Sequence, residues 1–482
     1  MGFFIYESPL YDETTLLLSV GMGISLLIGV KLSRKYLFDQ LAMITLSFLI
    51  FVFPRLLMYL VAPEYVEFPF GDNIDANTVN VGLFYVLTGF VFFLSGMMIA
   101  NPFIMTNLRT FSIVSENLRA YSNKNLLMLF LFTMAIQLYS SLNLGISPYG
   151  KMQTDSFNVL FQGIRTVLEV DSCFVFVLAA LLLKNFLSGT NRKSAIIFIV
   201  LVYIAMTVLG GSRAGTMRVI MSLAVIVIIL YGNARIKIIK LINILLLLIT
   251  LSLAVFPLAT FSRLMIIGSH REDNSPIEFA TEETQNLVEI KGLIARVCNR
   301  MGTIDYPILI ATQEGDKAAQ SKFHAIQYPI KNIINMLLPG TPFPENAIMT
   351  SRAIDIIYRG GPETDMYERY NSEFWTLWGI TYIYFGWFGG ILAMFCTGFI
   401  CHMLYGIIVT HLPGLQKFYL RLWFLYYAMN GIIWNMGIDS AVTAIFQGLL
   451  QFAFLSGCIY FLNYISLIFN RFTKKTAISI IQ

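Results

Sequence analysis

The feature that most constrains this chain is a series of apolar runs near the length of about 20 residues that an α-helix needs to cross a bilayer. The clearest runs occupy residues 14–30, 41–61, 80–100, 125–143 and 168–186. Further spans are predicted at 194–209, 214–232, 238–261, 385–409, 418–436 and 440–468. Hydrophobic residues make up 57% of the chain and charged residues 13%, about half the usual share of charge in a soluble domain. The sequence therefore predicts an all-α, polytopic integral membrane protein with about eleven transmembrane helices.

The distribution of positive charge predicts the orientation of these spans. About half of the 33 Lys and Arg residues fall in the short segments that lie inside if the N-terminus is outside. Among the 28 acidic residues, those same segments hold only Asp39 and Glu116. This is the positive-inside pattern. We therefore expect the N-terminus outside and the C-terminus inside the cell.

The chain divides into three predicted parts by polarity. Residues 1–261 form an N-terminal membrane bundle of about eight spans, 262–372 a large outer loop, and 373–482 a C-terminal bundle of about three spans. Loops this long are uncommon unless they are functional or disordered. The loop segment TQNLVEIKGLIARVCNRM repeats apolar residues at helical spacing, which predicts an amphipathic helix.

Several arginines lie where the positive-inside pattern gives no reason for them. Arg213 occupies the tight link VLGGSRAGTMR, where it either holds a phosphate at a helix N-terminus or reaches lipid headgroups. Arg263 directly follows the eighth predicted span. Arg296 and Arg300 are four residues apart, so a continuing helix would present both on one face. The two arginines either clamp a diphosphate or belong to an ordinary solvated helix face. For Arg55, in FVFPRLLMYL, we expect snorkelling or packing at a kink.

Candidate general bases on the predicted outer side are His270, His324, Asp305, Asp365 and Glu373. His324, in KFHAIQYPIK, suits a base at neutral pH because an ordinary histidine pKa is about 6.5, although a plain surface histidine also fits. Glu373 lies where the predicted loop returns to the membrane. It either acts as a base through partial burial or is a carboxylate that stabilises the beginning of a helix.

The sequence contains no P-loop, no strand-linked GxGxxG, no HExxH and no Cys or His pairs at metal-ligand spacing. We therefore expect no metal and no cofactor. Because the positive residues border apolar runs, we also expect no nucleic-acid partner.

Two short segments and the overall plan resemble one known family. These segments are the Gly-Ser-Arg-Ala-Gly turn at 211–215 and the stretch TLWGITYIYFGWFGG from Thr376 to Gly390, which contains a Tyr-x-x-Phe-Gly-x-x-Gly pattern. With many spans and one long outer loop before the last few, the chain resembles the O-antigen polymerase family, the Wzy-type oligosaccharide repeat-unit polymerases. Many relatives carry an acidic residue one to five positions before the Phe-Gly, whereas this chain has Ile380 to Tyr384, so Glu373 is a possible substitute.

The resemblance implies a GT-C-like glycosyltransferase in the bacterial inner membrane. It implies metal-independent transfer of a growing glycan from undecaprenyl diphosphate to another lipid-linked repeat unit on the periplasmic face. Arg213, Arg263, Arg296 and Arg300 would then bind the substrate diphosphate, with His324 or Glu373 as the catalytic base. Its expected partners are undecaprenyl-diphosphate-linked oligosaccharides as donor and acceptor, membrane lipid and a possible chain-length regulator protein. A flippase or other transporter, or an O-antigen ligase, remains an alternative.

Overall fold

The computed structural model describes residues 9–32, 35–66, 74–108, 123–143, 376–412 and 414–425, the short segments 178–182, 304–305, 307–308, 451–461 and 464–465, and the single residues 201, 261, 334, 448 and 468. The regular elements of this part are helical, which confirms the all-α prediction for it. They are α1 (Glu13–Leu32), α2 (Lys35–Phe51), α3 (Phe53–Val61), the short 3₁₀ helix η1 (Pro63–Tyr65), α4 (Ala76–Leu108), α5 (Asn123–Asn143), α17 (Leu377–His411) and α18 (Gly414–Trp423).

Among the described residues, three helices are long and apolar enough to cross a membrane. These are α1, α17 and the part of α4 that runs from Ala76 to Ile104. Large apolar side chains along them are exposed, among them Leu17 and Leu392. Such side chains disfavour water but match the acyl chains of lipid. The described part therefore indicates a membrane-associated protein.

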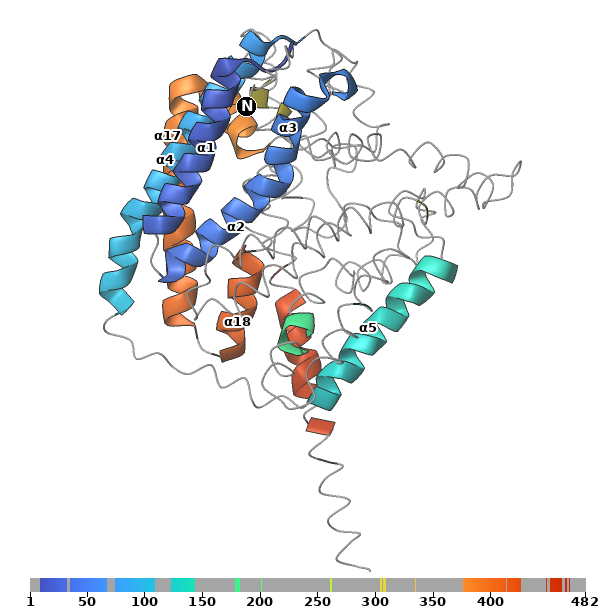
Figure 1. Ribbon diagram of the computed structural model, residues 1–482. Coiled ribbons are helices and arrows are strands. Elements are labelled where there is room, and N and C mark those ends of the chain that lie inside the picture. The colour runs from blue at the N-terminus through green and yellow to red at the C-terminus, as the bar shows by residue number, and fades with distance from the viewer. Residues whose placement is uncertain are drawn as a thin grey trace, which may run out of the picture.

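Helices α1 and α4 run in the same direction, side by side (Figure 1). Near their beginnings the Thr15 hydroxyl donates to Asn80 Oδ1 at 2.7 Å, and further along Gly29 lies against Leu94. Because later residues of α1 contact later residues of α4, the two helices are parallel. The end at which α1, α4 and α17 begin is called the upper end below, as it lies in Figure 1, and the opposite end the lower end.

Helix α17 is also parallel to α4 and packs against it through glycines. Gly89 lies against Met394, and Gly406 lies against Ile104 further down both helices. Between these points a Cβ at Gly398 would overlap the Phe93 carbonyl oxygen. Small residues at such positions let two apolar helices approach to backbone contact, which is how helices associate in lipid.

A break separates α2 from α3, where the sequence predicts one span at 41–61. Pro54 lacks an N–H, and the N–H groups of Arg55 and Leu56 both donate to the Val52 carbonyl oxygen at 3.1 Å. The expected kink near Arg55 is therefore confirmed. Together α2 and α3 return the chain from the lower end toward the upper end (Figure 1).

Polar caps tie the upper ends of α1 and α4 together. Asp12 and Thr15 each accept a hydrogen bond from the other's backbone N–H, at 2.8 and 3.1 Å, in the manner of a capping box. Asn80 Nδ2 donates to both carboxylate oxygens of Asp12 at 2.9 Å. The Thr15 backbone N–H and the Asn80 amide hold the pKa of the Asp12 carboxyl below its ordinary value. The caps thus fix the register of the two helices.

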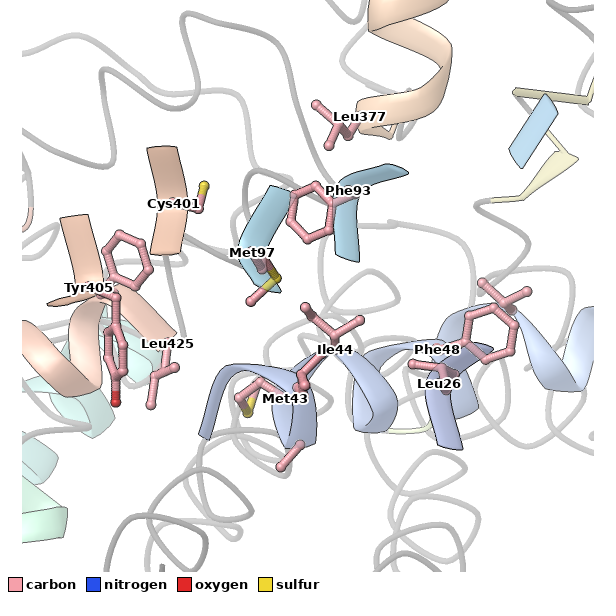
Figure 2. Close-up of a cluster of buried hydrophobic side chains, with 14 of the residues drawn as sticks. Leu26, Met43, Ile44, Phe48, Phe93, Met97, Leu377, Cys401, Tyr405 and Leu425 are labelled. Carbon is pink, nitrogen blue, oxygen red and sulfur yellow. The ribbon is translucent and has the colours of Figure 1, made fainter. Parts of the chain in front are cut away.

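One apolar core joins these helices. Figure 2 shows Leu26 of α1, Ile44 of α2, Met97 of α4 and Cys401 of α17 among its buried side chains. Side chains of α5 and of residues 178–182 belong to the same core.

The predicted spans at 14–30, 80–100, 125–143 and 385–409 each overlap one helix, with α4 and α17 longer than predicted. The spans at 194–209, 214–232 and 238–261 and the boundaries of the three predicted parts lie outside the described residues, save for residues 201 and 261. The parallel course of α1, α4 and α17 agrees with the predicted alternation of spans. Which end faces outward stays a prediction.

Candidate functional site

The sequence pattern that carries the family resemblance lies at a break in α17. Gly386 has φ 67° and ψ −164°, a non-helical conformation in which a residue with a Cβ is strained. The break falls within the Tyr-x-x-Phe-Gly-x-x-Gly pattern, between Tyr382 and Gly389. The helix begins close by, at the N-cap residue Thr376, whose hydroxyl accepts from the Gly379 N–H at 3.5 Å. Gly386, the first glycine of this pattern, therefore has a conformational reason to be glycine.

Aromatic side chains pack around this break on the side of α4. The rings of Tyr85 and Tyr382 meet edge to face at 5.2 Å, and Trp387 lies 5.1 Å from Tyr85. The Tyr85 hydroxyl is 3.3 Å from the Thr381 hydroxyl. Away from α4, Phe388 is 87% exposed, and a Cβ at Gly386 would meet no atom of the described residues within 4 Å. The break thus presents one packed face and one accessible face.

A buried ion pair joins α3 to the long polar segment that follows residue 261. Arg55 Nη2 donates to Asp305 Oδ2 at 2.5 Å, and Arg55 Nε donates to Asp305 Oδ1 at 3.0 Å. The Tyr59 hydroxyl donates to the same Oδ1, and the Arg55 guanidinium lies 5.5 Å from the centre of the Tyr59 ring. Arg55 and Tyr59 are fully buried, and Asp305 is 1% exposed.

This ion pair decides between the two alternatives for Arg55 and removes one candidate base. Arg55 does not snorkel to headgroups, because its guanidinium is enclosed by protein and bound to a carboxylate. Asp305 was one of five candidate bases, but both of its oxygens accept hydrogen bonds from buried donors. Because both oxygens are occupied by these donors and enclosed by protein, Asp305 is not placed to meet an acceptor hydroxyl.

A second ion pair, between the buried Asp39 and the largely buried Arg421, lies at the lower end. Arg421 Nη2 of α18 donates to Asp39 Oδ2 of α2 at 2.5 Å. The Tyr405 hydroxyl of α17 donates to the same oxygen at 2.9 Å and accepts from Arg421 Nε at 3.0 Å. Three helices therefore meet at one closed triangle of charge-assisted hydrogen bonds. Asp39 and Arg421 were predicted on the same side of the membrane, and the pairing agrees with that.

His402 is a further polar residue at the lower end, and it is buried. Its Nδ1 hydrogen bonds with Gln40 Oε1, and its Nε2 lies 3.3 Å from Asn101 Oδ1 of α4. The ring is fully buried at the lower end, away from the break at Gly386. It therefore binds four helices into one layer together with Asp39, Arg421 and Tyr405.

The site residues predicted from the sequence are Arg213, Arg263, Arg296, Arg300, His324 and Glu373. All six lie outside the described residues. Their convergence on one site therefore stays a prediction. Within the described part, no group of three or more His, Cys, Asp or Glu side chains is placed to hold a metal ion.

Comparison with protein-family models, with curated proteins and with solved structures finds no match for this chain.

The two ends of the bundle differ in their described side chains. At the upper end the polar segment containing Asp305 is fixed beside a broken helix with accessible aromatic side chains. Aromatic rings bind both sugar faces and the membrane interface through their apolar faces and polar edges. The lower end carries charges that are already paired with one another.

Sequence reasoning missed both ion pairs. A charged residue inside an apolar run is costly in lipid, so Arg55 signals a partner somewhere in the chain. The partner lies 250 positions away, and no local pattern identifies it.

Proposed function

We propose that this protein polymerises undecaprenyl-diphosphate-linked oligosaccharide repeat units into O-antigen or a similar surface polysaccharide, at the upper end of the bundle, which would face the periplasm. The observation that carries the proposal is the break at Gly386. It gives the first glycine of the Tyr-x-x-Phe-Gly-x-x-Gly pattern a conformational role near the beginning of α17.

The chemistry is an exchange at the anomeric carbon of the donor glycan. The acceptor hydroxyl oxygen forms a bond to that carbon, the bond from carbon to the diphosphate oxygen breaks, and the hydroxyl proton passes to a base. His324 or Glu373 would take the proton. Arg213, Arg263, Arg296 and Arg300 would bind the departing undecaprenyl diphosphate through bidentate hydrogen bonds. A diphosphate ester is a good leaving group, so stabilising its charge supplies much of the catalysis without a metal.

The first test is a map of lipid-linked glycans in cells of the native host that lack this protein. We expect single repeat units on undecaprenyl diphosphate to accumulate on the outer leaflet, where a membrane-impermeant oxidant of sugar diols reaches them. Long polymer should be absent from the cell surface, and the intact gene should restore it. Mass spectrometry of extracted glycans, with and without the oxidant, measures both quantities.

A transporter is the second candidate, because the buried Asp39 and His402 and the largely buried Arg421 place ionisable groups within the helices. Loss of a flippase would leave single repeat units on the inner leaflet, protected from the oxidant. Loss of a ligase would instead leave long polymer on undecaprenyl diphosphate. Either result would contradict the polymerase.

A further inference from the structure

We propose that Arg55, Tyr59 and Asp305 form an anchor that fixes the polar segment 262–372 to the upper end of the bundle and thereby positions the reactive residues of that segment. The docking follows from contacts within the described residues. Its part in the reaction rests on the proposed function.

The polar half of the anchor is a buried two-point clamp. Arg55 donates to both oxygens of Asp305, at 3.0 and 2.5 Å, and the Tyr59 hydroxyl donates as well. A planar guanidinium bound in this way fixes both the distance and the angle of the carboxylate. Separating the pair would leave two charges without compensation in an apolar interior. The carboxylate therefore holds its segment of chain in one place.

The apolar half of the anchor flanks the carboxylate. Ile304 and Ile308, on either side of Asp305, are both buried in the core of the bundle. Ile308 lies so close to Gly82 of α4 that a Cβ at Gly82 would overlap its Cα. Only a glycine admits the segment at this depth. Polar and apolar contacts thus hold the same short stretch of chain.

The anchor lies next to the broken helix. Gly82, which seats Ile308, precedes Tyr85 by three residues, about 4.5 Å along the axis of α4. Tyr85 in turn contacts Thr381, Tyr382 and Trp387 around the break at Gly386. Helix α4 therefore holds the anchored segment and the aromatic cluster at the same end of the bundle.

The chain length from Asp305 limits where the proposed diphosphate ligands lie. Arg300 precedes Asp305 by five residues, and five residues span at most about 17 Å. Fixing Asp305 therefore limits how far Arg300 can lie from the anchor. The anchor residues touch no substrate in this account, so they are positioning residues.

The test uses a cysteine in place of Ile308 as a reporter of docking. Ile308 is fully buried, so Ile308→Cys should react slowly with a membrane-impermeant maleimide in intact cells. Mass spectrometry identifies the labelled peptide and separates it from the native cysteines. In this background Asp305→Asn removes the charge, and Arg55→Lys keeps the charge but loses the two-point geometry. Arg421→Lys is the matched control, because it makes the same change in the ion pair at the lower end.

We expect Asp305→Asn and Arg55→Lys to speed labelling at position 308 by about tenfold or more, because labelling follows the population of the open state. Both should also shorten or abolish surface polymer per unit of protein extracted from membranes. Arg421→Lys should leave the labelling rate and the polymer per unit of protein near those of the parent. If Asp305→Asn does not accumulate, Arg55→Lys decides the outcome.

Unchanged labelling, or equal acceleration by Arg421→Lys, would overturn the anchor. Faster labelling with normal polymer would overturn the positioning role and leave the proposed function intact. If the parent protein supports no polymer, the proposed function fails and the positioning role fails with it. The labelling rates still decide separately whether the anchor exists.

Discussion

Replacing Arg421 with methionine lowers the free energy of unfolding by about 3–5 kcal/mol, the usual cost of removing one partner of a buried ion pair. The carboxylate of Asp39 is then left inside the bundle with the Tyr405 hydroxyl as its remaining partner in the triangle. Helices α2, α17 and α18 lose the contact that joins them at the lower end. Unfolding of purified protein in mixed detergent micelles, titrated with a denaturing detergent, measures the loss.

Two further variants distinguish the loss of the ion pair from a general effect of a substitution in α18. Gln416→Met also introduces a methionine into α18, but at an exposed position, and it should change the free energy of unfolding little. Adding Asp39→Leu to Arg421→Met removes the second charge, and most of the lost stability should return, because the desolvation cost disappears as well. A double variant as unstable as Arg421→Met alone would show that the triangle is not held by its charges.

A single methyl group at Gly398 should destabilise the bundle by about 2–3 kcal/mol, since overpacking a close contact costs energy that the structure cannot relax cheaply. The added Cβ would overlap the backbone carbonyl oxygen of Phe93, and a backbone atom cannot rotate away as a side chain does. Helices α4 and α17 must then separate along their length, which weakens dispersion contacts throughout their interface. Thermal unfolding of Gly398→Ala in detergent measures the effect.

Gly23→Ala in α1 is the matched control, because a Cβ there meets no atom of the described residues within 4 Å. Glycine lowers helix stability by up to about 1 kcal/mol relative to alanine, so this variant should unfold at the same or a higher temperature. The two substitutions are chemically identical and should act in opposite directions. Equal losses of stability would contradict glycine-mediated packing of α4 on α17.

Much of the described fold follows from local sequence. Apolar runs near spanning length predict helices because the backbone in lipid must satisfy its own hydrogen bonds, and α1 and α5 nearly coincide with their predicted spans. Pro54 predicts the kink that separates α2 from α3, since proline cannot donate within a helix. The break at Gly386 was not predicted, because glycine is also frequent inside membrane helices and does not by itself mark a break.

The pairings inside the bundle could not be predicted in this way. Arg55 and Asp305 are 250 positions apart, and Arg421 and Asp39 are 382 apart. Each side chain has an ordinary local explanation, Arg55 as a snorkelling residue and Arg421 as an inner positive charge. Only tertiary contacts identify the partner. The six site residues named from the sequence, including Arg213 and His324, lie outside the described residues and remain predictions.

The most direct measurement of the proposed activity is glycan elongation by the purified full-length protein in lipid vesicles. A single repeat unit on undecaprenyl diphosphate, from the native host, serves as donor and acceptor, with a chelator present. Arg213→Lys and Arg300→Lys are compared with the parent at equal amounts of folded protein. Lysine keeps the charge and loses the bidentate geometry.

Mass spectrometry of the extracted lipid should show a ladder whose members differ by one repeat unit, with release of undecaprenyl diphosphate at each step. Both lysine variants should reduce the ladder strongly while unfolding at the parent's temperature. A folded parent protein that leaves the repeat unit unextended, with or without divalent metal, would contradict the polymerase.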